Sequence, residues 1–239
     1  LVISPTWANG TDVLARFFLP EAAPVELSGI ERYINDLHPF DDLTVFILPP
    51  EEFKLVLDSP KFTGITTVAT LPYPNGQAGF FFVKMRYVEN IKAIFDAELE
   101  DRRAMVTAEV KIGAETVTVR HSRLDMGQIK DIFDGNPDSM ARSLAANPLH
   151  LQIDFSSPRM LNAIVMRVGS TATTFELSMQ VQGEENPRIL TRQLAESSVL
   201  RDYEIAFESR LSIRQLYITI KNTNDPEPGH VHLWEVTFK

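Results

Sequence analysis

The residues best suited to bind a ligand lie in the loop after the first strand-like run. That loop contains Trp7 and Asn9, and Asp12 opens the helical pattern behind it. Glu51 takes the equivalent place after a later strand-like run, at 43–48. Ligands of open α/β sheets bind beyond the carboxyl ends of the strands. An aromatic ring, an amide and two carboxylates at this edge therefore predict a ligand-binding site of Trp7, Asn9, Asp12 and Glu51.

A structural role is the alternative for the same loop. Trp7 would then cover the start of the helix, and Asn9 or Thr11 would cap it. An enzyme site at Trp7 and Asn9 would need a deep pocket lined by converging polar groups. The chain contains no G-x-G-x-x-G, Walker A, G-x-S-x-G or H-E-x-x-H motif, so the best-defined phosphate, hydrolase and zinc-protease signatures are absent.

Composition narrows the class of protein further. The chain has 239 residues, a formal net charge of −9 and no cysteine. The absence of long basic runs argues against nucleic acid and anionic lipid as partners. The absence of cysteine excludes disulfides, thiolate zinc sites and a cysteine nucleophile. No apolar run reaches the length of a membrane-spanning helix. Because the sequence opens in what reads as the middle of a strand, we expect a fragment of a longer polypeptide.

The first half, residues 1–103, has the pattern of an α/β domain. Short apolar runs alternate with amphipathic segments, as in βα units around a partly parallel sheet. The apolar residues of the first helix share one face: Val13, Leu14, Phe17 and Phe18. Two later runs, at 65–70 and 80–88, flank an Asn-Gly turn and predict a hairpin. We expect a Rossmann-like three-layer α/β domain.

The second half, residues 104–239, has lost most of the helical periodicity. Strand-like segments recur there between turns, and eight are candidates: 105–112, 115–121, 149–155, 162–168, 174–182, 203–207, 213–221 and 232–238. Many short strands at this density predict an antiparallel β-sandwich or jelly roll. The predicted fold class is therefore α/β plus all-β.

Five segments of the second half follow a recognisable order. They are IFDGNPDS at 132–139, PLHLQIDF at 148–155, LNAIVMR at 161–167, RQLYITI at 214–220 and LWEVTF at 233–238. This order resembles that of the discoidin domains, also called coagulation factor V/VIII type C domains, which are galactose-binding-like. The resemblance implies an eight-stranded jelly roll that binds sugars, and in some members lipid or protein, through loops at one end.

The same resemblance implies a structural calcium ion near the DGN turn. Carried over by position, its ligands would be Asp134, Asn136, Ser139 and Glu235 with nearby backbone carbonyls. Calcium takes six to eight oxygen ligands, which such a set can supply. The alternative is an ordinary turn beside a solvated strand residue. The chain departs from the family pattern at Met140, because an aromatic residue usually follows the serine there.

Sugar binding requires an exposed aromatic ring that stacks on C–H faces and planar polar groups that bind hydroxyls. The second half has one tryptophan, Trp234, and its place in the last strand predicts a core residue. The candidate binding loops at 171–173 and 222–228 contain no aromatic residue. His230 and His232 alternate along that strand; they could bind a metal with a third histidine or lie at a solvated strand end.

A second resemblance concerns three segments of the first half: ISPTWANGTD at 3–12, LPPEEF at 48–53 and GFFFVKMRY at 79–87. They are similar to the soluble tails that follow the membrane helices of some bacterial glycosyltransferases of the dolichyl-phosphate-mannose-protein mannosyltransferase type. Such a tail lies outside the cytoplasmic membrane. It holds none of the catalytic acids, which in that family lie between the membrane helices.

Together these patterns predict the non-catalytic, extracytoplasmic tail of a membrane glycosyltransferase. It would be attached to a membrane-embedded parent chain and help to recognise a glycan or a glycosylated acceptor. Two alternatives stay open. One is a secreted or surface carbohydrate-binding module, which an exposed aromatic cluster at the loop end of the sandwich would favour. The other is an α/β enzyme with a site near Trp7.

Overall fold

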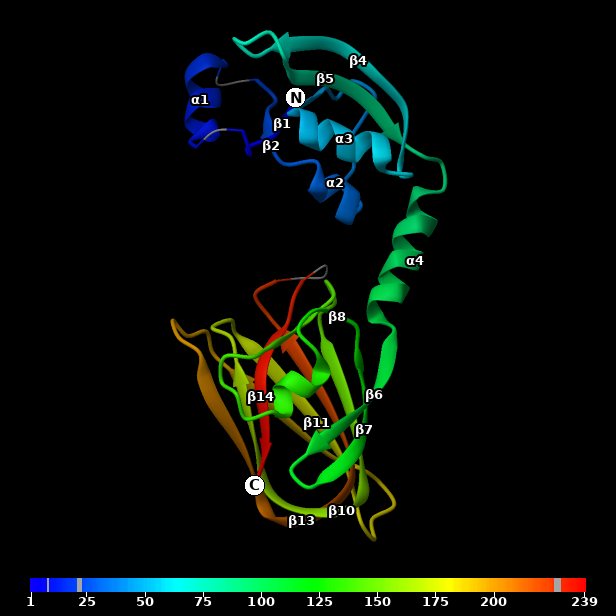
Figure 1. Ribbon diagram of the computed structural model, residues 1–239, viewed down its shortest axis with the longest axis vertical. Helices are drawn as coiled ribbons and strands as arrows, with labels where there is room; N and C mark the ends of the chain where they lie inside the picture. The colour runs from blue at the N-terminus through cyan, green and yellow to red at the C-terminus, as the bar shows by residue number, and fades with distance from the viewer. Residues whose placement is uncertain (8, 21–22, 226–228) are drawn as a thin grey trace. The chain divides into compact units, whose positions relative to one another are not determined.

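The computed structural model describes residues 1–7, 9–20, 23–225 and 229–239. The chain divides into two compact units, Leu1–Glu98 and Leu99–Lys239 (Figure 1). The boundary falls inside helix α4 (Ile91–Arg103), whereas the sequence analysis places it after this helix. Among the described residues, no helix is both long enough and apolar enough to cross a membrane.

The first unit is built on a mixed sheet with the strand order β2-β1-β3-β5-β4. Its strands are β1 (Val2–Ile3), β2 (Glu26–Leu27), β3 (Phe46–Leu48), β4 (Phe62–Pro72) and β5 (Ala78–Tyr87). β1 pairs in parallel with β2 and β3, whereas β5 pairs antiparallel with β3 and β4. The β4–β5 pair confirms the predicted hairpin. A Rossmann-like three-layer domain is not shown, because a tight turn joins the two longest strands and leaves no crossover helix between them.

Two of the helices of this unit bury apolar side chains against the sheet. The helices before α4 are α1 (Thr11–Phe18), α2 (Glu31–Asn35) and α3 (Pro50–Asp58). Tyr33 of α2 and Val56 of α3 are fully buried and belong to one cluster with Phe46 of β3 and Val83 of β5. This cluster, rather than intrinsic helix propensity, holds the short α2 in place, since five residues cannot form a stable helix alone.

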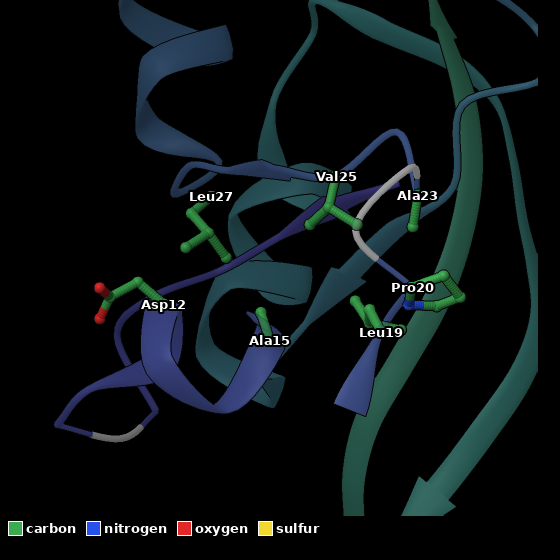
Figure 2. A pocket seen from close by; sticks show the side chains of 7 residues that line it. All are labelled: Asp12, Ala15, Leu19, Pro20, Ala23, Val25 and Leu27. Carbon is green, nitrogen blue, oxygen red and sulfur yellow. The ribbon is translucent and has the colours of Figure 1, made fainter. Parts of the chain in front are cut away.

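Helix α1 packs differently, because its apolar face is not buried. Val13 is 64% exposed and Phe17 is 80% exposed, and the side chain of Phe18 lies outside the described part of the structure. A cavity of about 810 Å³ lies beside α1 and β2 (Figure 2). Its described lining consists of one carboxylate and six apolar side chains: Asp12, Ala15, Leu19, Pro20, Ala23, Val25 and Leu27.

The second unit consists almost entirely of antiparallel strands. They are β6 (Met105–Ile112), β7 (Glu115–Ser122), β8 (Leu124–Met126), β9 (Ala141–Ser143), β10 (Leu149–Val168), β11 (Thr173–Val181), β12 (Arg188–Leu194), β13 (Arg201–Asn222) and β14 (His232–Phe238). A 3-10 turn, η1 (Ile129–Phe133), precedes the DGN turn. The order along the main path is β12-β11-β13-β10-β14-β9-β8, and β7 pairs with β10 and β6.

Strands β10 and β13 each run through both layers of a sandwich. Their pairing register shifts between Asp154 and Arg159. Before this shift β10 pairs with β7 and the last part of β13, which also pairs with β11; after it, β10 pairs with β14 and the first part of β13. The segments predicted as separate strands at 149–155 and 162–168 are therefore two parts of one bent strand.

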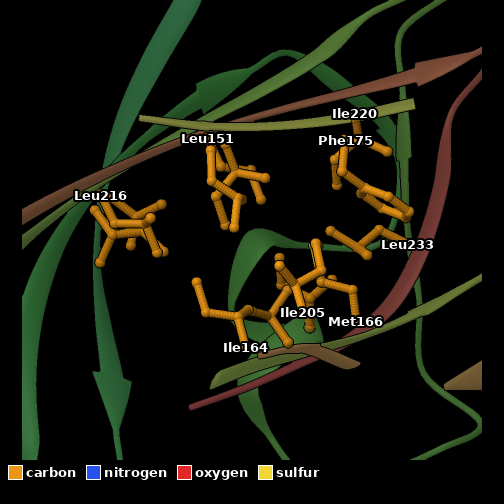
Figure 3. Packing of buried hydrophobic residues seen from close by; sticks show 14 of the residues in the cluster. Leu151, Ile164, Met166, Phe175, Ile205, Leu216, Ile220 and Leu233 are labelled. Carbon is orange, nitrogen blue, oxygen red and sulfur yellow. The ribbon is translucent and has the colours of Figure 1, made fainter. Parts of the chain in front are cut away.

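The core lies between these two layers. Leu151, Phe175, Leu216 and Ile220 of one layer face four buried side chains of the other: Ile164, Met166, Ile205 and Leu233 (Figure 3). Inward and outward residues alternate along β11 and along the first part of β10, as a two-residue period requires. The predicted antiparallel β-sandwich is confirmed.

Candidate functional site

The structure brings together the four residues that the discoidin resemblance assigns to a cation. Glu235 of β14 reaches the DGN turn, where its Oε2 accepts a hydrogen bond of 3.2 Å from the backbone N–H of Gly135. Ser139 Oγ lies 3.0 Å and 3.1 Å from the two carboxylate oxygens of Asp134. It also lies 2.8 Å from the carbonyl oxygen of Asn136 and 3.1 Å from that of Asp131.

This group of atoms is rich in oxygen, and two backbone donors reach its carboxylates: the Asn136 N–H donates to Asp134 Oδ1 at 2.8 Å, and the Gly135 N–H donates to Glu235. Ser139 has one hydroxyl proton, yet four acceptor oxygens lie within 3.1 Å of its Oγ. Most of these lone pairs therefore receive no proton from it. No group of three His, Asp or Glu side chains among the described residues is placed to hold a metal, so carbonyl and hydroxyl oxygens would have to complete the set. A donor set of this kind fits the hard cation Ca²⁺.

Electrostatics at Glu235 agree with this fit. Burial and the neighbouring carboxylate of Asp134 raise the pKa of Glu235, while the Gly135 N–H and Arg167 oppose the rise. Glu235 also lines a cavity of about 340 Å³ with Arg167 and Asp202, which form a two-pronged ion pair at 2.7 Å and 3.1 Å. Two carboxylates that face each other without a cation between them disfavour each other's charge.

Strand β14 carries a β-bulge at Trp234. Arg167 of β10 pairs with Glu235, but Val168 pairs with Leu233, so Trp234 is the extra residue. The prediction that Trp234 lies in the core is wrong. Strict alternation counted back from the buried Val236 would place it inside. The bulge instead leaves both Trp234 and Glu235 partly exposed.

Polar and aromatic side chains adjoin Trp234. The His232 ring stacks on the indole with 6.0 Å between centroids and an interplanar angle of 29°, and the His230 ring lies 6.4 Å from His232. His232 pairs across the strands with Arg142 of β9. Arg142 forms a two-pronged ion pair with Asp125 of β8, in which Nε donates to Oδ1 (2.7 Å) and Nη2 donates to Oδ2 (3.1 Å). We refer to Asp125, Arg142, His230, His232 and Trp234 as the β14 patch.

The charge state of the patch suits an uncharged polar ligand. Burial lowers the pKa of His232, and the charges of Arg142 and His230 lower it further, against a smaller opposite effect of Asp125. The lowered pKa favours the neutral imidazole of His232, in which one ring nitrogen donates and the other accepts. Arg142 and Asp125 neutralise each other within their pair.

Two buried asparagines anchor the loop that carries His230. Asn147 Nδ2 donates to the carbonyl oxygens of Asn222 (2.6 Å) and Asp225 (2.8 Å), and the backbone N–H of Asn222 donates to Asn147 Oδ1 (3.0 Å). The Asn222 side chain donates in turn to the carbonyl of His230 (3.3 Å). Hydrogen bonds between asparagine side chains and the main chain thus hold the backbone at His230, just before β14.

The four ligand residues predicted in the first unit are not brought together around one cavity. Trp7 is 40% exposed and packs edge-on against Phe80, with 5.2 Å between centroids. Asn9 and Glu51 are exposed. Only Asp12 lines the cavity beside α1 (Figure 2), and its other described lining side chains are apolar. The converging polar groups that an enzyme site near Trp7 requires are not found in the described lining.

The buried carboxylate beside Glu51 was not among the predicted site residues. Glu52 Oε1 accepts hydrogen bonds from the hydroxyls of Ser4 and Thr6, the latter at 2.7 Å. Its Oε2 accepts from the backbone N–H of Ile30 at 3.0 Å. Glu52 is buried and therefore ties the segments that follow β1 and β2 to the start of α3. Two features of the sequence could have indicated this contact: the polar Ser4 directly after an apolar run, and an acidic residue at the start of a helix.

Fold and site thus define the second unit as an antiparallel β-sandwich with an aromatic and polar patch on its last strand. No protein-family model matches the chain, and no curated protein matches it. Solved structures similar to it include "the family 32 CBM from C. perfringens NanJ in complex with galactose", at 16% identity and a TM-score of 0.39, over 51% of this chain and 92% of that chain.

Two further similar structures are also carbohydrate-binding modules by their descriptions. One is chitosan-binding module 1 of a chitosanase/glucanase from Paenibacillus sp. IK-5, at 14% identity and a TM-score of 0.39, over 51% of this chain and 92% of that chain. The other is "CBM32 of AlyQ in complex with 4,5-unsaturated mannuronic acid", at 16% identity and a TM-score of 0.37, over 55% and 98%. Likenesses this distant do not indicate what this chain binds, and the expected resemblance to glycosyltransferase tails gains no support from them.

Proposed function

We propose that the second unit is a carbohydrate-binding module and that the β14 patch is its sugar site. One observation carries this proposal: the partly exposed Trp234 ring stacks with His232, and His232 pairs across the strands with Arg142 of the two-pronged Arg142–Asp125 ion pair. The C–H face of a pyranose stacks on an aromatic ring, while neighbouring hydroxyls take hydrogen bonds from a guanidinium and give them to a carboxylate.

The carbohydrate-binding module is favoured over the glycosyltransferase tail, because its site consists of described residues of this chain. We propose an extracytoplasmic location for it, either secreted or on the cell surface, where a glycan or glycosylated acceptor would be met. A membrane-embedded parent chain stays compatible with this role. An enzyme near Trp7 is not favoured, since the cavity there lacks a polar lining.

The test is a titration of the whole chain with a panel of neutral monosaccharides, in calcium, by isothermal titration calorimetry and thermal unfolding. We expect at least one hexose to bind and to raise Tm, because a ligand at 100 times its Kd stabilises the native state by about 2.7 kcal/mol. A chain that binds none of the panel, or binds only through the first unit, contradicts the proposal.

We propose in addition that Asp134, Ser139 and Glu235 hold a calcium ion together with the carbonyl oxygens of Asp131 and Asn136. Support comes from the four oxygens that cluster around Ser139 Oγ and share its single hydroxyl proton. When bound, the ion would supply positive charge between two carboxylates. Asn136 would contribute its backbone oxygen, because its side-chain oxygen already accepts the Asp138 N–H at 3.1 Å.

Removal of calcium is expected to lower the Tm of the second unit by about 5 °C or more. An ion that binds only the native state at 100 to 1,000 times its Kd stabilises it by about 3–4 kcal/mol, and each kcal/mol shifts Tm by roughly 2–8 °C. Thermal unfolding in calcium and in EGTA measures this shift. The Asp134→Asn variant should show no such difference, while Asp138→Asn, in the same turn, should behave as wild type. Equal Tm values for the wild-type chain in both buffers would refute the site.

A further inference from the structure

The β-bulge in β14 joins the cation cluster to the sugar patch through two consecutive residues. Glu235 belongs to the cluster, through the Gly135 N–H, and Trp234 belongs to the patch, through the His232 ring. A bulge residue has no partner opposite it in the ladder, and bulges commonly re-aim a side chain. The direction of the Trp234 side chain is therefore set by its neighbours rather than by regular pairing.

On one side, the indole ring lies against the main chain at Gly169. A Cβ built on Gly169, just after β10, would lie 3.5 Å and 3.8 Å from two carbons of the Trp234 ring, so the ring approaches the main chain at a residue without a side chain. On the other side, the Glu235 carboxylate accepts a hydrogen bond from the Gly135 N–H, which helps to fix the backbone of Glu235. Because Trp234 and Glu235 share one peptide group, a shift of the Glu235 backbone also shifts the backbone of Trp234.

Electrostatics make the position of Glu235 depend on its charged neighbours. Without a cation, Glu235 accepts from Gly135 close to the carboxylate of Asp134, and the two like charges repel each other. Repulsion then disfavours the position in which Glu235 accepts from Gly135. With a divalent cation between them, both carboxylates are attracted to the turn. The cation thus favours the position of Glu235 that the structure shows.

We propose that Glu235 is a positioning residue of the sugar site, which couples calcium binding at the DGN turn to sugar binding at Trp234. This inference rests on the proposed function. Linkage requires the effect to be reciprocal: calcium strengthens sugar binding and sugar strengthens calcium binding by the same factor. A coupling in the usual range corresponds to a change of about tenfold in each affinity.

The experiment uses the fact that the chain has two tryptophans, Trp7 and Trp234. In a Trp7→Phe variant of the whole chain, Trp234 is the sole indole, and its fluorescence reports the patch while calcium is added without any sugar. We expect a saturable change of emission. A second substitution, Glu235→Gln, should abolish this change. Thr237→Ala is the matched control, because Thr237 lies in the same strand and lines the same cavity as Glu235; this variant should keep the change.

Sugar affinity is then measured calorimetrically in calcium and in EGTA. The inference expects affinity about tenfold weaker in EGTA for the Trp7→Phe chain and for Thr237→Ala, but no calcium dependence for Glu235→Gln, although that variant stays folded by thermal unfolding. Equal sugar affinity in both buffers, or an indole signal that does not respond to bound calcium, overturns the coupling and leaves the proposed function intact. A chain that binds no sugar in either buffer overturns the proposed function itself.

Discussion

Replacement of Trp234 by alanine should weaken sugar binding at least 30-fold while the second unit stays folded. Truncating an aromatic residue at the centre of a binding site costs about 2 kcal/mol or more, which equals about a 30-fold loss of affinity. Trp234 lies outside the buried cluster of the sandwich, so the variant should lose little stability. Calorimetric titration with the best sugar of the panel measures the loss, and near-ultraviolet circular dichroism reports on folding.

Trp7→Ala is the matched control, because it removes the same side chain from the exposed loop of the first unit. Its sugar affinity should equal that of the wild-type chain. The reverse result, with binding lost in Trp7→Ala and kept in Trp234→Ala, would place the ligand at the loop that the sequence analysis selected and would exclude the β14 patch.

Replacement of Glu52 by alanine should lower the free energy of unfolding of the first unit by about 3 kcal/mol. The change removes the acceptor of three hydrogen bonds from Ser4, Thr6 and Ile30. Ser4 is completely buried, and a buried donor left without a partner costs about 1–3 kcal/mol. Urea unfolding followed by Trp7 fluorescence in a Trp234→Phe background isolates this unit.

Glu51→Ala provides the comparison, because the Glu51 carboxylate is next to Glu52 in the same helix turn but is exposed. It should change the free energy of unfolding by less than about 0.5 kcal/mol, as surface substitutions usually do. If both variants were equally stable, the buried hydrogen bonds of Glu52 would contribute nothing, and its place among the ends of three strands would need another explanation.

The difference between Glu51 and Glu52 shows where sequence reasoning stops. Both acids lie in the first turn of α3, where the helix dipole favours either. Which of them turns inward depends on how α3 packs against the ends of β1 and β2, and these strands have two residues each. No local pattern records that packing. The sequence therefore predicted polar residues at this edge of the sheet, but the prediction named the exposed Glu51 and not the buried Glu52.

In the second unit the two-residue period predicted most of the core. Leu149, Leu151 and Ile153 are buried as the alternation requires. The continuity of β10 was not predictable, because Ser156, Ser157 and Pro158 read as the end of a strand, yet β10 continues through them. Strand identity there is decided by pairing with β13, which lies far along the chain.

Of the two candidate sites in the second unit, one was predicted from the sequence and the other was not. Asp134, Asn136, Ser139 and Glu235 were selected through the family resemblance, and the structure gathers them at one turn. The β14 patch was not predicted, because Trp234 points outward only through the bulge. Its partner Arg142 lies on a strand of three residues, β9, which is too short to recognise by periodicity.

The bent strands β10 and β13 also make the two layers of the sandwich depend on each other. Leu149 pairs with Ile220 in one layer, and Val168 pairs with Arg201 in the other, so the chain passes from the first layer to the second within β10 and back within β13. A cut anywhere within the interval 149–222 would leave both layers incomplete. We therefore expect that neither layer folds alone and that the sandwich forms only as a whole.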